Sequence, residues 1–404
     1  MARHDSVWAS GLTLLLIVGI GGCGARATPP AHNAGRSAGP VTIYVANAGG
    51  DTVTPILAAS NTAGQPIVIG RVPWELAISP DGQTAYVVGL GGIVPGPTPV
   101  TLTAISTATN RPSRRITLCA HDNMASLARI AITPDSRTVY ITCPGIGEVV
   151  PVRAGAGTSD NPIRIASPWL PTMTPDGKTV YVANAGAGIV TPISTATDEP
   201  GKPIRVGQAP LDMAITPDGK TLLVMTYTGV TLVDVATNRA GKSVAIVGGV
   251  ALAVAPGGAT AYVVAQPDPD SHQGFVVPFD IRADTAGRPI KVGMDPGRII
   301  ITPGGKMAYV SNSASGSVTP IQLADGRAEP AIAAGKYPTG LAISPDGKTV
   351  YVVDSNPYGE LISGPSFGGS PFGAGQVIPI RVATNSAEKP IKVGPFPASI
   401  AIAS

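Results

Sequence analysis

Short apolar segments separated by turn residues recur along the chain from Val41 to Ile402. Each segment has four to six residues, is rich in β-branched side chains, and is bounded by Gly, Pro, Asn or Asp. This pattern is typical of short β-strands. The segments are continuous apolar runs rather than clean alternations of apolar and polar residues, which predicts strands buried on both faces.

The segments form an internal repeat. Tyr-Val-Ala-Asn at 44–47 returns at 181–184, Tyr-Val-Ser-Asn stands at 309–312, and related starts occur at 86, 140, 223, 262 and 351. A second, a third and a fourth apolar segment follow each start, and all four occur eight times. Four short strands with a period of about 42 residues match a propeller blade. The sequence therefore predicts an all-β fold, a single β-propeller of eight four-stranded blades.

The fourth segment of each repeat runs into a turn such as Pro217-Asp218-Gly219. Pro presets φ, Asp hydrogen-bonds the backbone that follows it, and Gly accepts a positive φ. Small residues recur on this segment, at Ala77, Ala131, Ala214, Ala253, Ala342 and Ala401. Since wedge-shaped blades converge at the axis, we expect this strand to be the innermost one.

The Tyr-Val-Ala-Asn starts and the Ile-Thr-Pro-Asp-Gly-Lys-Thr turn resemble the YVTN-repeat β-propellers, with Ala or Ser in place of the motif's Thr. The resemblance covers residues 41–402. It implies the fold but no ligand, because the motif residues are structural. Many relatives have seven blades, so seven is the alternative to eight.

The ends of the repeat region predict how the ring closes. The chain starts with a Tyr-type strand at 41–46 and ends with an innermost-type strand at 398–402. We expect 398–402 to complete the blade formed by residues 41–70, since this pairing removes a free strand edge.

The N-terminal segment resembles the signal of bacterial lipoproteins. Residues 12–20 form an apolar run that is too short to span a bilayer as a mature helix, and Ile20-Gly21-Gly22-Cys23 follows. We expect 1–22 to be a signal peptide, 23–40 the lipidated Cys23 and a flexible tether, and 41–404 the propeller. An ordinary signal peptide with a Cys at its cleavage site is the alternative. The expected location is the outer face of the bacterial cell membrane.

Composition narrows the function classes. Only 13% of residues are charged and the net charge is +3, with no run of Lys and Arg that would form a basic stripe, so we expect no nucleic-acid partner. We also expect a monomer without a cofactor. His121 and His272 lie in different repeats with no hydrolase motif, and haem or copper would need more ligands. Asp268, Asp270 and His272 form an acidic loop without calcium-loop spacing, which is typical of a solvated loop.

Connection lengths distinguish the two faces of the ring. The step from the innermost strand to the Tyr strand is constant (Ile78 to Tyr86, Ile215 to Leu223), as is the step from the second to the third segment. The step from the Tyr strand to the second segment varies, being 12 at Tyr44 but 29 at Tyr351. Because strands alternate in direction, the variable connections share one face. Neutral drift is the alternative, but variable loops on a rigid scaffold commonly carry function.

The residues that enter the innermost strands are candidates for a binding site on the variable face. Equivalent positions include Glu75, Asp212 and Arg298, and Trp74 and Trp169 stand one position before such sites. Indoles on a loop rim suit stacking on sugars or peptides, although they would also serve as caps between blades. The loop 354–374, with Tyr358, Phe367 and Phe372, is expected to act as a mobile flank.

Two functional hypotheses follow from these residues. The first is a binding or interaction scaffold for a glycan, peptide or protein, attached to the cell membrane through Cys23. The alternative is a metal-dependent, lactonase-like hydrolase with its site at the channel mouth. The ring positions offer two acids and two arginines, which favours ion pairing over metal capture.

Cys119 and Cys143 remain if Cys23 carries lipid. An exported protein can keep a disulfide, and both cysteines are expected at the variable face, so we predict a bond between them. Two buried thiols are the alternative.

Overall fold

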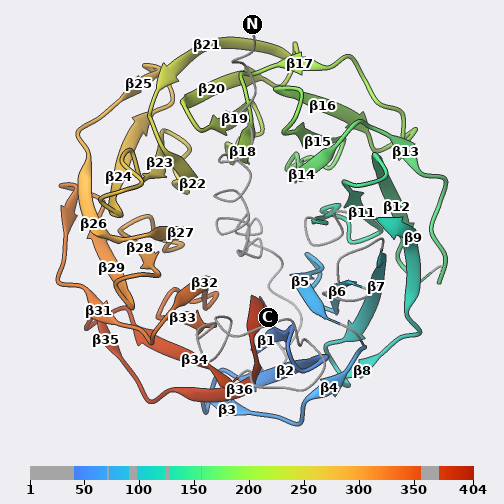
Figure 1. Cartoon of the computed structure of the whole chain (residues 1–404), viewed down its shortest axis with the longest axis horizontal. Coiled ribbons are helices and arrows are strands. Elements are labelled where there is room, and N and C mark those ends of the chain that lie inside the picture. The colour runs from blue at the N-terminus through green and yellow to red at the C-terminus, as the bar shows by residue number, and fades with distance from the viewer. Residues whose placement is uncertain (1–40, 71, 91–97, 123–127, 156, 356–372) are drawn as a thin grey trace, which may run out of the picture.

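The computed structural model describes residues 41–70, 72–90, 98–122, 128–155, 157–355 and 373–404. Within these ranges the chain forms strands and turns and no helix, and hence no helix that could span a membrane. The strands make eight antiparallel sheets around a central axis (Figure 1). The molecule is a β-propeller of eight blades, as predicted, and not seven.

Every blade has the same order from the axis outward. The innermost strands are β37 (Pro397–Ala403), β5 (Pro73–Ile78), β10 (Ile130–Ile132), β14 (Pro168–Met173), β18 (Pro210–Ile215), β22 (Gly249–Val254), β27 (Pro296–Ile301) and β32 (Pro338–Ile343). The second strands are β1 (Thr42–Asn47), β6 (Thr84–Leu90), β11 (Thr138–Cys143), β15 (Thr179–Asn184), β19 (Thr221–Thr226), β23 (Thr260–Ala265), β28 (Met307–Asn312) and β33 (Thr349–Asp354).

The two outer strands of each blade complete this order. The third strands are β2 (Thr52–Leu57), β7 (Thr98–Ser106), β12 (Glu148–Arg153), β16 (Ile189–Ser194), β20 (Gly229–Asp234), β24 (Gln273–Asp280), β29 (Ser317–Gln322) and β34 (Ala374–Arg381). The outermost strands, all short or broken except β21, are β3 (Thr62–Ala63) with β4 (Ile67–Val68), β8 (Arg111–Pro112) with β9 (Ile116–Asp122), β13 (Ile163–Arg164), β17 (Ile204–Arg205), β21 (Arg239–Ala245), β25 (Thr285–Ala286) with β26 (Ile290–Met294), β30 (Arg327–Ala328) with β31 (Ile332–Ala333), and β35 (Ser386–Ala387) with β36 (Ile391–Pro395). We number the blades from one to eight, starting with the blade that contains β1.

The C-terminal strand closes the ring. β37 pairs antiparallel with β1, with Ala401 opposite Tyr44 and Ala403 opposite Thr42. Blade one therefore combines the two ends of the propeller region, as the sequence predicted, and the edge of β1 is covered.

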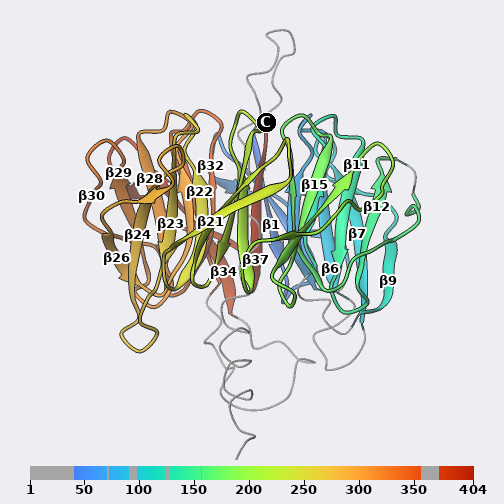
Figure 2. The ribbon, with the colours of Figure 1, turned by 90° about the horizontal axis from the view of Figure 1, so that it is seen from above.

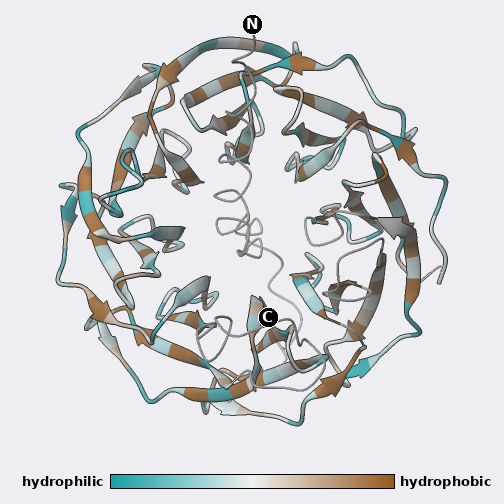
Figure 3. Ribbon diagram, viewed as in Figure 1, coloured by the Kyte–Doolittle hydropathy of each residue, from teal (hydrophilic) through white to brown (hydrophobic). Residues whose placement is uncertain are grey.

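The core lies between the blades rather than at the axis. Ile43 and Val45 face blade eight, whereas Tyr44 and Ala46 face blade two. Since both faces of each blade are covered in this way, the strands need apolar side chains at successive positions, and Figure 3 shows apolar colour concentrated on the strands. This arrangement explains why the sequence showed continuous apolar runs.

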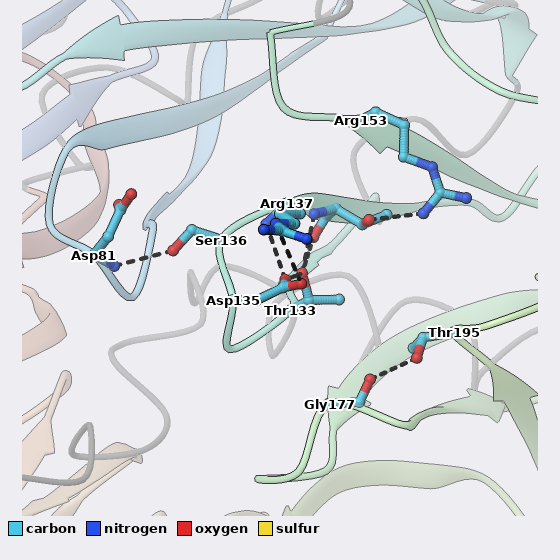
Figure 4. Close-up of polar contacts among 9 residues, drawn as sticks. Asp81, Thr133, Asp135, Ser136, Arg137, Arg153, Gly177 and Thr195 are labelled. Carbon is cyan, nitrogen blue, oxygen red and sulfur yellow. Dashed lines mark hydrogen bonds and ion pairs between the residues drawn. The ribbon is translucent and has the colours of Figure 1, made fainter.

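Hydrogen bonds close the turns between the innermost and second strands, including the blade-three turn, which has Ser136 in place of the Gly. In blade three the Thr133 hydroxyl donates to Asp135 at 2.6 Å and the Arg137 N–H donates to the same oxygen at 3.0 Å (Figure 4). The Thr133 bond contributes most to a lowered pKa of Asp135. Neighbouring turns also touch, because the Asp81 N–H donates to the Ser136 hydroxyl at 3.0 Å.

Tyrosines of the second strands join adjacent blades. Five of them reach the Oδ1 atom of an Asn or Asp in the following blade, and the residue that accepts has a positive φ. The pairs are Tyr44 with Asn110, Tyr140 with Asp198, Tyr181 with Asn238, Tyr309 with Asn385, and Tyr351 with Asn61. At these five junctions the tyrosine of the repeat is thus an inter-blade hydrogen-bond donor.

The strand directions define two faces. The innermost-to-second turns lie on one face, which we call the invariant face, and the second-to-third connections lie on the other, the variable face. β1 begins and β37 ends at the invariant face, at the upper edge of Figure 2. The connection between β23 and β24, residues 266–272, projects from the opposite, variable face.

Candidate functional site

The innermost strands begin at the variable face, and the same break in strand pairing recurs at their start. In seven blades the pairing of the innermost strand with the second strand shifts register next to its first residue. A non-glycine residue with positive φ precedes that first residue at Val72, Ser167, Ala209, Asp295 and Phe396. A bulge at this place redirects the side chains that follow it, and these are the candidate site residues.

Glu75 and Asp212 are buried, and each accepts a hydrogen bond from the backbone of the neighbouring blade. The Ile130 N–H donates to Glu75 at 3.4 Å, and the Leu252 N–H donates to Asp212 at 2.9 Å. Ser399, at the equivalent position, accepts from the Leu76 N–H at 3.2 Å. These bonds satisfy backbone donors on the inner edge of the next blade. The expectation that Glu75 and Asp212 form an open rim is therefore corrected: both side chains are at most 5% exposed.

Glu75 also holds Arg129 in a buried ion pair. Glu75 Oε2 lies 3.2 Å from Arg129 Nε, and the guanidinium stands 5.7 Å from the centre of the Trp169 ring. A cation over an indole face is attracted by the ring quadrupole. Trp169 is half-buried against the cluster between blades four and five. Arg129 and Trp169 thus link blades three and four at the variable face.

Trp74 is also half-buried. Its ring lies 6.5 Å from that of Phe396, tilted by 35°, and packs on the apolar cluster that joins blades one, two and three. Both indoles therefore contribute to capping between blades, the role that the sequence left open, while part of each side chain stays exposed. Arg298 is half-buried, and its backbone N–H donates to Ser311 at 3.1 Å.

Known structures share this fold. The chain aligns with the dihydro-heme d1 dehydrogenase NirN in complex with DHE at a TM-score of 0.68 and 14% identity, over 99% of this chain and 82% of that one. AztD from Citrobacter koseri aligns at 0.62 and 13% identity, over 90% and 98%. Hydrazine synthase from Kuenenia stuttgartiensis aligns at 0.56 and 19% identity, over 69% and 92%.

The likeness is one of fold. At these identities it establishes the propeller and carries no activity. No protein-family model matches the chain, and no curated protein sequence matches it.

Large apolar side chains are exposed mainly at the variable face. In the described ranges six such side chains are exposed, and four of them lie at the variable face: Ile146, Tyr227 and Val247 in connections, and Met294 at the end of β26. Leu57 stands at the invariant end of β2, and Val68 stands on the outermost edge. The sequence does not distinguish these four residues from buried strand residues, because each lies beside a strand or at its end. Tyr227 between two threonines was the signal available.

His272 lies on the same face in the acidic loop. Its Nδ1 is 2.7 Å from Asp295 Oδ1, and this hydrogen bond is the main cause of a raised pKa of His272. Asp268 accepts from the Asp270 N–H at 3.0 Å. Among the described residues, no three His, Cys, Asp or Glu side chains gather in a way that could hold a metal ion.

Cys119 and Cys143 form a disulfide with their Cα atoms 6.4 Å apart. Cys119 belongs to β9 of blade two and Cys143 ends β11 of blade three, so the bond joins two blades near the variable face. Both residues are buried. Several predicted features lie outside the described residues: the signal, Cys23 and the tether, the His121 side chain, and Tyr358, Phe367 and Phe372.

Proposed function

We propose that this protein is an extracytoplasmic, lipid-anchored β-propeller that acts as a binding or interaction scaffold and engages its ligand through the variable face. The observation that carries the proposal is that four of the six exposed large apolar side chains in the described ranges lie on this face, at Ile146, Tyr227, Val247 and Met294. Exposed apolar side chains that gather on one face mark interaction sites more often than scattered ones do. The uneven loop lengths of the same face support the assignment.

The position of β1 indicates how the protein would be oriented if it were anchored to a membrane through Cys23. β1 begins with Thr42 at the invariant face, so a tether from Cys23 joins the ring on that side. A flexible tether of this length spans on the order of 20 Å. A lipid on Cys23 would hold the invariant face toward the membrane and present the variable face to the surroundings.

The contacts of Glu75 and Asp212 do not favour the alternative function, a metal-dependent, lactonase-like hydrolase. A metal site at the channel mouth would draw on Glu75 and Asp212, whose carboxylates are buried and bonded to backbone N–H groups of the next blade. Glu75 is further paired with Arg129. Among the sequence candidates, Trp74, Trp169 and Arg298 keep partial exposure and are proposed as ligand contacts beside the apolar side chains.

Face-selective blocking tests the proposal. Two variants in a Cys23→Ser background, Ile146→Cys on the variable face and Lys220→Cys on the invariant face, are coupled to a bulky maleimide polymer. Each is then probed on glycan and peptide arrays. We expect the blocked Ile146→Cys protein to lose its array signals and the blocked Lys220→Cys protein to keep them. The reverse pattern would place binding on the invariant face and overturn the proposal.

The anchor needs its own measurement. Cells grown with an alkyne-bearing fatty acid should label the wild-type protein, and Cys23→Ala should abolish the label and release the protein from the membrane fraction. Retention of the label by Cys23→Ala would contradict the lipid assignment without affecting the binding face.

A further inference from the structure

Four short segments of blades five to seven are linked by hydrogen bonds on the variable face. We call them the belt, formed by residues 227–228, 246–248, 266–272 and 294–295. The Gly248 N–H donates to the Tyr227 carbonyl at 2.8 Å, and the Gln266 N–H donates to the Gly248 carbonyl at 2.8 Å. The Gln266 amide donates to Asp295 at 3.2 Å, and the Asp295 N–H donates to the His272 carbonyl at 2.9 Å. Hydrogen bonds thus fix the belt as one surface.

Three large apolar side chains stand exposed on the belt. Tyr227 is 46% exposed, Val247 51% and Met294 44%. They follow one another through consecutive blades along bonded backbone. Tyr and Met are enriched at the centres of protein interfaces, and Met adapts its shape to different partners. The belt therefore offers apolar anchor points on a backbone that is already ordered.

The charge of the belt has one dominant sign. It contains Asp268, Asp270 and Asp295 and no Lys or Arg, although the whole chain carries a net charge of +3. His272 Nδ1 lies 2.7 Å from Asp295 and forms a hydrogen bond with it, whereas Asp268 and Asp270 stand on the projecting loop. A surface of this sign attracts cationic partners and repels anionic ones.

We propose that the belt docks a cationic segment of a partner protein through apolar side chains that contact Tyr227, Val247 and Met294, while its Lys or Arg residues lie beside Asp268 and Asp270. The proposal rests on the proposed function, binding at the variable face, and names the partner's chemistry. Charge complementarity selects this occupant. An anionic lipid surface would be repelled by the carboxylates, and a neutral polysaccharide would leave them without a counter-charge.

A designed peptide tests the belt. The probe is a fluorescent peptide of alternating Lys and Leu, measured by fluorescence anisotropy against the exported full-length protein with Cys23→Ser. Peptides of the same length with Glu and Leu, or with Lys and Ser, are the controls. We expect binding of the Lys–Leu peptide and at least about tenfold weaker binding of either control. Equal binding of the Glu–Leu peptide, or no binding of the Lys–Leu peptide, overturns the proposal.

Matched variants locate the contact. Tyr227→Ser, Val247→Ser and Met294→Ser combined should weaken binding about tenfold. Asp268→Asn with Asp270→Asn should weaken it several-fold and reduce its salt dependence. Leu57→Ser with Val68→Ser removes exposed apolar side chains elsewhere and should change nothing, as should Asp325→Asn. All of these positions are exposed, and unchanged thermal unfolding verifies that each variant is folded.

The outcomes separate the two proposals. If the belt variants bind like the wild type, while blocking at Ile146→Cys abolishes binding, the belt assignment falls and the variable face stands. If binding is lost only on blocking at Lys220→Cys, both proposals fall. If the belt variants lose peptide binding while the control variants keep it, the belt proposal is supported.

Discussion

Leu223 of blade five and Asp284 of blade six occupy the two positions that a tyrosine and its acceptor fill at five other blade junctions. Asp284 has the positive φ of those acceptors, and its Oδ1 atom is buried without a hydrogen-bond partner. Phe279, in the same cluster as Leu223, replaces the Ile or Val found at this register in the other blades. The larger ring thus fills the space that the smaller Leu223 leaves.

This exchange predicts a coupled stability change. Leu223→Tyr alone should destabilise by about 1–3 kcal/mol, because it overpacks against Phe279. Leu223→Tyr with Phe279→Ile restores the common pattern and gives Asp284 a donor, which should recover that loss and add about 1 kcal/mol. Denaturant unfolding of both single variants and the double variant checks the cycle. Additive effects would contradict the coupling.

Alkaline pH should unfold the ring through its tyrosines. Burial raises the pKa of Tyr44, Tyr181, Tyr309 and Tyr351 to about 12, and that of Tyr140 further. In the unfolded chain tyrosine has a pKa near 10, so between about pH 10 and about pH 12 the unfolded state loses protons that the folded state keeps. Stability should therefore be full below about pH 10 and fall as pH rises to about 12. Denaturant midpoints over this range check it, and a constant midpoint would refute it.

The buried pair of Glu75 and Arg129 should behave as a unit. Glu75→Gln keeps an acceptor for the Ile130 N–H but removes the charge beside the guanidinium, and should cost about 3–5 kcal/mol. Adding Arg129→Met should recover most of this loss, because no buried charge then lacks its counter-charge. Chemical unfolding measures both variants. Equal stability of the Glu75→Gln variant and the wild type would show that the pair is not buried as described.

The disulfide between Cys119 and Cys143 should stabilise the junction of blades two and three. It spans a sequence separation of 24 residues, for which chain entropy gives about 3 kcal/mol. Cys119→Ser with Cys143→Ser should lower the free energy of unfolding by that amount, and a reductant should do the same to the wild type but not to the variant. A reductant effect of equal size on both would assign the change elsewhere.

Deletion of residues 398–404 should destabilise the whole ring rather than one blade. It removes most of β37, exposes the edge of β1 and separates the two ends of blade one. Thermal unfolding should remain a single transition at a lower temperature, with increased aggregation. A truncated protein as stable as the wild type would show that closure is dispensable.

The sequence by itself determined the architecture. Strand type, blade number and closure by 398–402 follow from short local patterns that are repeated eight times. A deviation in one copy, such as Leu223 in place of Tyr, therefore did not obscure the repeat. The chain direction through those strands was enough to separate the two faces.

Only the tertiary structure decided which side chains are accessible. Glu75 and Asp212 are polar residues near strand ends, which suggested an open rim, but the neighbouring blade covers them, and its backbone N–H groups donate hydrogen bonds to their carboxylates. Tyr227 and Val247 resemble strand continuations and Met294 ends β26, yet all three are exposed. Exposure in a ring depends on the blade alongside, and that blade's contacts are set by residues some 40 or more positions away, beyond any local pattern.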